Sequence, residues 1–281
     1  MKVAYCPAHI TCMFYPSDFG PAPLDRGSRG VGIKLGMGTT VRAVESYAPY
    51  VTIDGSHTYA PVSLEVMRRC GTNLRLDIVN DLPVGQGFGT SASGAIATAI
   101  CASKGGTLDD VYRIAHDVEL MNGTGLGDVA GISCRASQPI RLEGGYANDG
   151  RVVGSKIAFQ RLTLAVLGPP VSTSKTLSDP KIKDRLREVG SKCMDEFLEE
   201  KTKEALFRTS NMFSREMGLE SEEVSNAIEA LERKGVRSAM CMLGNSIFID
   251  SNEKAVRGIL GDVELYSTHT TASRPQIIQK E

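Results

Sequence analysis

The sequence predicts an α+β fold divided into two domains, residues 1–158 and 159–281, and three observations support this prediction. Segments with the alternating pattern of half-buried strands dominate the first part of the chain. A glycine-rich loop and two helical segments follow them. Further on, charged amphipathic helices alternate with short strands, as in α+β domains. At 281 residues the chain is long enough for two modest domains.

The expected N-terminal strands are three segments accompanied by a glycine-rich stretch. Residues 40–45 and 50–54 alternate only partly, whereas residues 73–79 (NLRLDIV) alternate as a half-buried strand does. Residues 26–38 (RGSRGVGIKLGMG) contain five glycines. We expect that stretch to be a loop that presents its side chains to a ligand.

The expected helices are recognised by small residues or by apolar stripes. Residues 91–103 are rich in small side chains, and residues 108–121 carry an apolar stripe preceded by Thr107, which resembles a capping box with Asp110. The remaining predicted elements are strands at residues 140–146, 162–167, 239–242, 246–250 and 263–267 and helices at residues 180–199, 203–217 and 221–233.

Composition excludes several classes of protein. With 32 basic and 33 acidic residues, the chain has no electrostatic reason to bind nucleic acid or an anionic membrane. Its seven cysteines contain no Cys-x-x-Cys pair, which argues against a zinc ribbon, a redox dithiol or a disulfide scaffold. Neither a secretory signal nor a long apolar run is apparent, so we expect a cytoplasmic protein.

The most informative segment is the loop at residues 83–93, PVGQGFGTSAS, between a predicted strand and a predicted helix. Glycines at alternate positions allow positive φ angles, and the helix that follows offers free N–H groups and a positive dipole end. Together these features predict a phosphate cradle. Its candidate nucleotide-binding residues are Pro83, Gly85, Gly87, Gly89, Thr90, Ser91, Ala92 and Ser93.

Three commoner motifs do not fit this loop. A Walker A loop needs a lysine at the helix start, a dinucleotide fingerprint needs glycine in place of Thr90, and a hydrolase elbow needs glycine in place of Ser93. A plain tight turn with a serine N-cap is the structural alternative.

Two acidic residues extend the hypothesis to phosphoryl transfer. Glu119 lies in the last turn of its predicted helix, where its charge opposes the helix dipole and a bound cation would compensate it. Asp128 lies in the flexible segment Gly-Leu-Gly-Asp. Phosphoryl transfer needs a metal ion and a group that orients or deprotonates the attacking hydroxyl. Glu119 with Ser91 suits the metal, and Asp128 suits the hydroxyl, although each acid alone is more often a surface or capping residue.

Four segments, in this order, resemble the GHMP family of kinases: residues 6–11 (CPAHIT), residues 83–93, Glu119 with residues 125–128 (GLGD), and residues 169–177 (PPVSTSKTL). Phe88 and Thr90 depart mildly from the family's central motif. The resemblance implies an N-terminal ATP-binding domain of ribosomal-protein-S5-like fold and a ferredoxin-like C-terminal domain. It also implies ATP and Mg²⁺ bound by the central loop, Ser91 and Glu119, and Asp128 as the active-site aspartate.

Within that family, residues 26–32 (RGSRGVG) and 241–249 (CMLGNSIFI), together with His9, resemble the pantoate kinases of archaea. The family usually carries lysine or arginine at the position of His9, so we expect His9 to act in catalysis by contacting the transferred phosphate. A buried histidine bonded to backbone is the alternative. This resemblance implies that (R)-pantoate is converted to 4-phosphopantoate with ATP in coenzyme A biosynthesis.

Pantoate requires a site for one carboxylate, and the glycine-rich stretch offers candidates. Arg29 is expected to bind the carboxylate with both guanidinium nitrogens, assisted by Ser28, while Arg26 is a weaker candidate with a solvated role as its alternative. The resemblance places Thr173 in the substrate site as well. The other histidines, His57, His116 and His269, lack metal-ligand spacing and are expected to be structural or exposed.

Other functions remain open at the level of sequence. A mevalonate-pathway or homoserine-type kinase of the same family is the main alternative. A nucleotide-dependent decarboxylase and a non-catalytic ligand sensor of the same fold are two more, although a sensor would be expected to have lost Glu119 or Asp128. The sequence does not fix the oligomeric state, and a homodimer is compatible with it.

Overall fold

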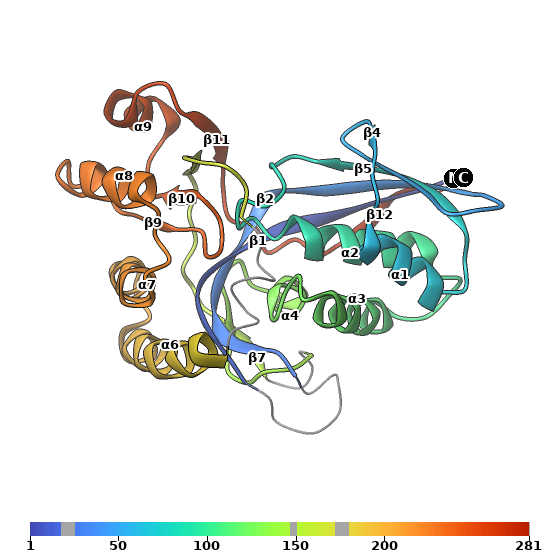
Figure 1. Cartoon of the computed structure of the whole chain (residues 1–281), viewed down its shortest axis with the longest axis horizontal. Coiled ribbons are helices and arrows are strands. Elements are labelled where there is room, and N and C mark those ends of the chain that lie inside the picture. The colour runs from blue at the N-terminus through green and yellow to red at the C-terminus, as the bar shows by residue number, and fades with distance from the viewer. Residues whose placement is uncertain (18–25, 147–150, 172–179, 281) are drawn as a thin grey trace.

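The computed structural model describes residues 1–17, 26–146, 151–171 and 180–280. Two sheets organise them, each with helices packed against it (Figure 1). In the described part of the chain the larger sheet has the strand order β12-β1-β2-β5-β3-β4, with β6 paired to β2 and β7 paired to β6. Its strands are β1 (Lys2–Pro16), β2 (Ser28–Glu45), β3 (Tyr50–Ile53), β4 (Ser56–His57), β5 (Leu74–Asn80), β6 (Pro139–Arg141), β7 (Val152–Gly154) and β12 (Gln276–Lys280).

Four helices accompany the larger sheet in the described residues. They are α1 (Pro61–Arg69), α2 (Thr90–Ala102), α3 (Leu108–Asn122) and α4 (Asp128–Ser133). Figure 1 shows α1, α2 and α3 on one side of the sheet. The predicted capping box is confirmed, because the Thr107 hydroxyl accepts from the amide of Asp110 and the Asp110 carboxylate accepts from the amide of Thr107.

The smaller sheet has the strand order β11-β8-β10-β9 and is entirely antiparallel. Its strands are β8 (Leu162–Val166), β9 (Ser238–Met240), β10 (Ser246–Ile249) and β11 (Glu264–Thr268). The helices of this half are α6 (Pro180–Glu200), α7 (Lys203–Met217), α8 (Glu222–Glu232) and α9 (Glu253–Leu260). The helices predicted at residues 180–199, 203–217 and 221–233 match α6, α7 and α8 closely, because each has a strongly amphipathic sequence.

The prediction of a loop at residues 26–38 was wrong, because most of these residues lie in a strand. From Ser28 onward they belong to β2, which pairs with β1 from Lys2 opposite Ala43 to Pro16 opposite Ser28. The glycines of this segment allow neighbouring groups to pack closely against the strand, and they do not form turns. A Cβ on Gly38 would lie 2.1 Å from the carbonyl oxygen of Cys6, and one on Gly36 would lie 2.5 Å from the ring of His269.

Strands β1 and β2 connect the two halves of the molecule. Ile10 and Ile33, from the middle of these strands, are fully buried in the same cluster as Phe197 and Phe248 of the C-terminal half. Strand β12 returns the end of the chain to β1, so that Lys2 and Lys280 lie opposite each other. Strands that precede residue 158 therefore contribute to the core of the C-terminal half, and β12, which follows it, belongs to the sheet of the N-terminal half.

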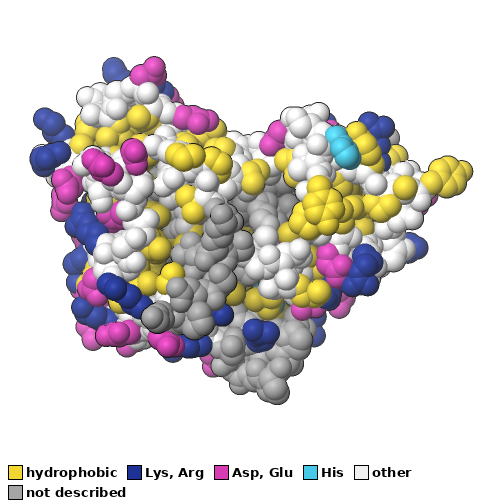
Figure 2. Space-filling model, in the orientation of Figure 1, with side chains coloured by type: hydrophobic (Ala, Val, Ile, Leu, Met, Phe, Trp, Pro, Cys, Tyr) yellow, Lys and Arg dark blue, Asp and Glu magenta, His cyan; other side chains and the backbone are white. Residues whose placement is uncertain are grey.

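The space-filling view shows a surface hollowed between two lobes (Figure 2). All seven cysteines are free thiols, and six of them are buried. None of the described helices is both long and apolar enough to cross a membrane.

Candidate active site

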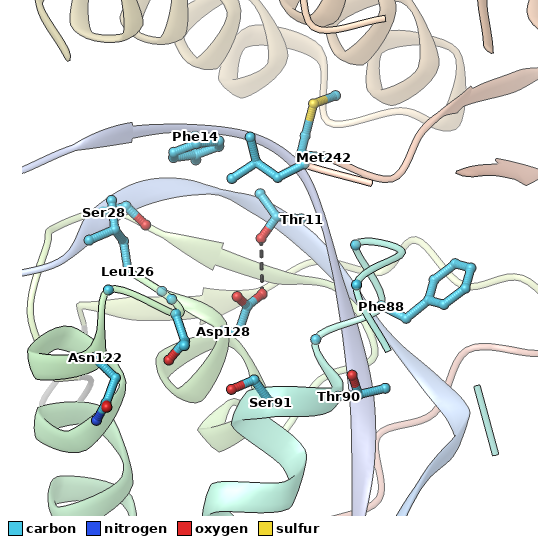
Figure 3. Close-up of a pocket in the computed structure, with 18 of the residues that line it drawn as sticks. Thr11, Phe14, Ser28, Phe88, Thr90, Ser91, Asn122, Leu126, Asp128 and Met242 are labelled. Atoms are coloured by element: carbon cyan, nitrogen blue, oxygen red, sulfur yellow. Dashed lines mark hydrogen bonds between the residues drawn. The ribbon is translucent and has the colours of Figure 1, made fainter. Parts of the chain in front are cut away.

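A cavity of about 330 Å³ lies where the glycine-rich loop meets the start of α2 (Figure 3). Gly85, Gly87 and Gly89 all have positive φ angles, 78°, 75° and 64°, as predicted. Gly89 is the N-cap of α2 and provides no side-chain cap, so the first amides of the helix are left for a ligand.

Five of the eight predicted nucleotide-binding residues line this cavity: Gly85, Gly87, Gly89, Thr90 and Ser91. Pro83, Ala92 and Ser93 do not line it. The Ser93 hydroxyl is buried, 2.7 Å from the Thr39 hydroxyl, and donates to the carbonyl oxygen of Thr90. The rotation of about 100° per helical residue turns position 93 toward the sheet, so the expected contact of Ser93 with phosphate is corrected.

Gln86 fixes the loop to the C-terminal half, and sequence reasoning missed it. Its buried side chain donates through Nε2 to the carbonyl oxygen of Gly168 (2.9 Å), and its Oε1 accepts from the amide of Asn245 (3.2 Å). The Ser246 hydroxyl donates to the main-chain oxygen of Gln86 (2.6 Å). Residues 241–249, one of the segments that resemble pantoate kinases, therefore hold the loop in place through Asn245 and Ser246.

Glu119 and Ser91 meet at the end of α3, as predicted. The Ser91 hydroxyl donates to Glu119 Oε1 at 2.6 Å, and the Thr124 hydroxyl donates to the same oxygen at 2.8 Å. Glu119 is only 2% exposed, and this burial raises its pKa to about 7 despite both hydrogen bonds. Such a desolvated carboxylate is poised to bind a cation.

Asp128 begins the short helix α4 instead of lying in a flexible loop, and its carboxylate faces the cavity. Oδ1 lies 2.7 Å from His9 Nδ1 and accepts from the Thr11 hydroxyl at 3.2 Å (Figure 3). Burial alone would raise the pKa of Asp128, but these hydrogen bonds and the nearby charge of Arg141 lower it below its ordinary value. Asp128 is therefore ionised at neutral pH.

His9 does not contact the cavity, which corrects the expectation that it meets the transferred phosphate. Its side chain is fully buried behind Asp128, and it is absent from the residues that line the cavity. The backbone alternative was wrong too, since the partner of Nδ1 is the Asp128 carboxylate. Burial lowers the pKa of His9 more strongly than Asp128 raises it, so the ring is neutral.

Ser28 lines the cavity and Arg29 does not. The two residues are neighbours on β2, and successive side chains of a strand point to opposite faces. The Arg29 guanidinium lies 5.3 Å above the ring of Tyr15. Arg26 is exposed, and its carbonyl oxygen lies 2.9 Å from Nε2 of the buried His116. The expected carboxylate clamp by Arg29 is therefore corrected.

Arg141, and not Arg29, is the arginine that lines the cavity. It lines the cavity from β6, is 1% exposed, and donates through Nε to the carbonyl oxygen of Ser28 at 3.4 Å. Its Nη1 has no hydrogen-bond partner among the described residues. Burial lowers its pKa and the charge of Asp128 opposes this, but an arginine stays protonated at neutral pH. No pattern in the sequence around Arg141 predicts that its side chain lines the cavity.

Phe14, Leu126 and Met242 form an apolar wall on the side of the cavity where Ser28 and Thr11 lie (Figure 3). Thr173 lies outside the described residues. His57 is exposed and stacks on Tyr50, in line with the surface role expected for it. Among the described residues there is no group of three or more histidine, cysteine or acidic side chains arranged to hold a metal ion.

Comparison with known proteins agrees with this geometry. Residues 58–135 match the family model described as the N-terminal domain of GHMP kinases. Mevalonate kinase superposes with a TM-score of 0.66 at 14% identity, covering 95% of this chain and 98% of that one. The chain has the GHMP kinase fold. The resemblance inferred from the motifs is thereby confirmed.

Other known proteins are more similar still. Pantoate kinase from Thermococcus kodakarensis is 29% identical over 93% of this chain and 92% of its own length. Pantoate kinase from Methanospirillum hungatei is 26% identical over 87% and 86%. A structure described as a phosphotransferase related to the CoA biosynthesis pathway superposes with a TM-score of 0.84 at 26% identity, covering 98% of this chain and 97% of that one.

The matched GHMP kinase interval contains only part of the site. Residues 58–135 include the cradle, Glu119 and Asp128. His9 and Ser28 precede the interval, and Arg141 follows it. The half of the cavity formed by the glycine-rich loop and α2 is thus the part that matches the family model, while the wall opposite it comes from β1, β2 and β6.

Proposed function

We propose that the chain is a pantoate kinase, which transfers the terminal phosphoryl group of ATP to the primary hydroxyl of (R)-pantoate and yields 4-phosphopantoate and ADP. The full-length similarity to three pantoate kinases supports this reaction. The observation that carries the proposal is the buried cation of Arg141, which lines the same cavity as the phosphate cradle and Asp128. A negatively charged acceptor is the ligand that such a site favours.

The nucleotide fits the side of the cavity formed by the loop and α2. Its phosphates would meet the amides at the start of α2, which the glycine conformations leave open. A second hollow, lined by Tyr59, Leu64 and Met121, adjoins the cavity because Asn122 lines both. Tyr59 is 81% exposed and Met121 is 62% exposed. These apolar side chains suit the flat face of an adenine ring.

Mg²⁺ fits the residues that are present. Ser91 and Glu119 would hold it, since Glu119 is a buried carboxylate that pairs with no basic side chain among the described residues. Mg²⁺ commonly binds one or two protein groups, and water and nucleotide phosphates complete its shell. The absence of a larger acidic cluster among the described residues suits that mode. When bound, Mg²⁺ neutralises charge that develops on the transferred phosphoryl group.

The acceptor side supplies three kinds of contact. Arg141 and Ser28 would hold the carboxylate of pantoate. Phe14, Leu126 and Met242 offer an apolar surface to its dimethyl carbon. The ionised Asp128 would then orient the primary hydroxyl and accept its proton as the oxygen attacks phosphorus.

The same proposal includes the finer description of the two domains, ribosomal-protein-S5-like for the N-terminal one and ferredoxin-like for the C-terminal one. The smaller sheet supports the second part. Its elements follow the order strand, helices, two strands, helix, strand, and its spatial order β11-β8-β10-β9 puts the first strand beside the last.

The test is ATP consumption with pantoate, mevalonate, mevalonate phosphates and homoserine as separate acceptors. We expect pantoate to give the highest kcat/KM. Homoserine carries an ammonium group, which the fixed charge of Arg141 disfavours, so it should be poor. A preference for mevalonate or its phosphates would overturn the substrate assignment, and no consumption with any acceptor would favour a ligand sensor.

A further inference from the structure

His9 is held in a closed compartment behind the active-site aspartate. Its ring is fully buried, and Nδ1 lies 2.7 Å from Asp128 Oδ1. Its main-chain amide donates to the carbonyl oxygen of Phe88, in the phosphate-binding loop, at 3.3 Å. His9 therefore touches both the aspartate and the loop without reaching the cavity.

Two glycines form the walls of this compartment, Gly32 on β2 and Gly131 on α4. A Cβ on Gly32 would lie 2.1 Å from His9 Nε2, and one on Gly131 would lie 2.4 Å from the same atom. Both distances are far shorter than a van der Waals contact. The absence of side chains at these two positions is therefore what makes room for the ring.

The surroundings determine where the single proton of the ring sits. His9 Nε2 is buried and has no hydrogen-bond partner among the described residues, so an N–H at that position would be unpaired. The charged groups that face the ring are Asp128 on α4, Arg141 on β6 and Lys34 on β2. The two cations disfavour a second proton. A neutral ring with its hydrogen on Nδ1 donates that hydrogen to Asp128. The only ring nitrogen then left without a partner is the unprotonated Nε2.

The two carboxylate oxygens of Asp128 differ in the number of hydrogen bonds that they accept. Oδ1 accepts from both His9 and Thr11. Oδ2 lies toward Gly125, where a Cβ would be only 3.4 Å away, and Gly125 lines the cavity. One oxygen is therefore anchored, and the other is presented to the ligand.

We propose that His9 is a positioning residue, which as a neutral Nδ1–H donor anchors Asp128 Oδ1 so that Oδ2 faces the acceptor hydroxyl, and that Gly32 and Gly131 form the slot that fixes its ring. The inference rests on the proposed function insofar as Asp128 acts on a hydroxyl. In this site the cation in the cavity is Arg141, and His9 contributes geometry without charge.

The test compares His9→Ala with His9→Asn, since the amide nitrogen of asparagine lies close to the position of imidazole Nδ1. His9→Ala should lower kcat about 10- to 100-fold, while the KM for ATP changes less than about twofold, because only the orientation of Asp128 is lost. His9→Asn should recover most of that turnover. Calorimetric binding of ATP shows that each variant is folded.

Gly131→Ala supplies an independent arm, because the three nearest atoms to its new methyl group would all belong to the His9 ring. It should lower kcat in the wild type and add little in the His9→Ala background, where the methyl group has room. If His9→Ala does not fold, His9→Asn and Gly131→Ala still test the hydrogen bond and the slot.

Two results would overturn the proposal: unchanged kcat in His9→Ala, or equal losses in His9→Ala and His9→Asn. Additive effects in the double variant would reject the slot. The kinetics use whichever acceptor the ATP-consumption screen prefers. A wrong substrate assignment therefore shows in that screen and leaves the test of His9 intact.

Discussion

Arg141 donates through Nε to the carbonyl oxygen of Ser28, 113 positions earlier in the chain, at 3.4 Å. This contact joins β6 to β2 at the wall of the cavity and directs a buried guanidinium toward it. Nη1 has no partner among the described residues, and under the proposed function the carboxylate of the acceptor would provide one.

Arg141→Lys should raise the KM for pantoate about 10- to 100-fold, because an ammonium cannot form two parallel hydrogen bonds to a carboxylate. The KM for ATP should barely change. The matched control is Arg29→Lys, since Arg29 lies over Tyr15 and does not line the cavity. Steady-state kinetics with pantoate and with 2,2-dimethyl-1,3-propanediol, which lacks the carboxylate, separates the effects. Equal losses on both acceptors, or a larger loss in Arg29→Lys, would contradict the role of Arg141.

Asp128→Asn should lower kcat by about two orders of magnitude or more, because the amide cannot accept the proton of the hydroxyl. ATP should bind with nearly unchanged affinity in calorimetry, since the cradle lies on other elements. Asp117→Asn makes the same change on the outer side of α3, where Asp117 pairs with Arg69, and should leave kcat unchanged. Near-normal turnover in Asp128→Asn would remove Asp128 from the chemistry.

Glu119 should make metal binding depend on pH. Because its pKa is raised to about 7, its carboxyl keeps a proton below that pH and loses it above. Without metal, the raised pKa means that stability is lost as pH rises from about 4.5 through about 7, and Mg²⁺ should restore it. The increase in Tm on adding Mg²⁺ should therefore be larger at about pH 8 than at about pH 6.

Glu119→Gln is the control for this pH dependence. The variant should show a small Mg²⁺ effect on Tm at both pH values and should need more Mg²⁺ for half-maximal activity. An unchanged magnesium titration in Glu119→Gln would show that Glu119 is not part of the metal site.

Gln86→Ala should lower the free energy of unfolding by about 1–3 kcal/mol, because the amide of Asn245 and the carbonyl of Gly168 lose a buried partner. The KM for ATP should rise as well, since the loop that holds the phosphates is then less restrained. Urea unfolding measures the first effect. Gln276→Ala, at an exposed position of β12, is the matched control and should cost far less.

Local sequence signals determined the half of the site formed by the glycine-rich loop and α2. Alternate glycines before a run of small residues predicted the positive φ angles of residues 85, 87 and 89 and the start of α2 near residue 90. The position of Glu119 at the end of α3 followed from the helical pattern of residues 108–121. These features depend on neighbours within a few residues, so they can be read without the tertiary structure.

The opposite wall of the cavity, which the proposed function assigns to the acceptor, was decided by tertiary structure alone. The glycines of residues 26–38 resemble those of a loop, but they allow a strand to pack closely against rings and carbonyl groups. Once the segment is a strand, alternation places Ser28 in the cavity and Arg29 outside it, and Arg141 arrives from a strand far along the chain.

Pairing across long sequence separations is the physical reason for this division. His9 and Asp128 are 119 positions apart, and no local pattern states which side chains such distant elements bring into contact. The sequence by itself determined the conformation of the glycine-rich loop, the start of α2 and the position of Glu119 at the end of α3, because each depends on neighbouring residues. Which arginine lines the cavity, and which histidine nitrogen contacts Asp128, depended on strand register and on the space left by glycines at positions 32 and 131.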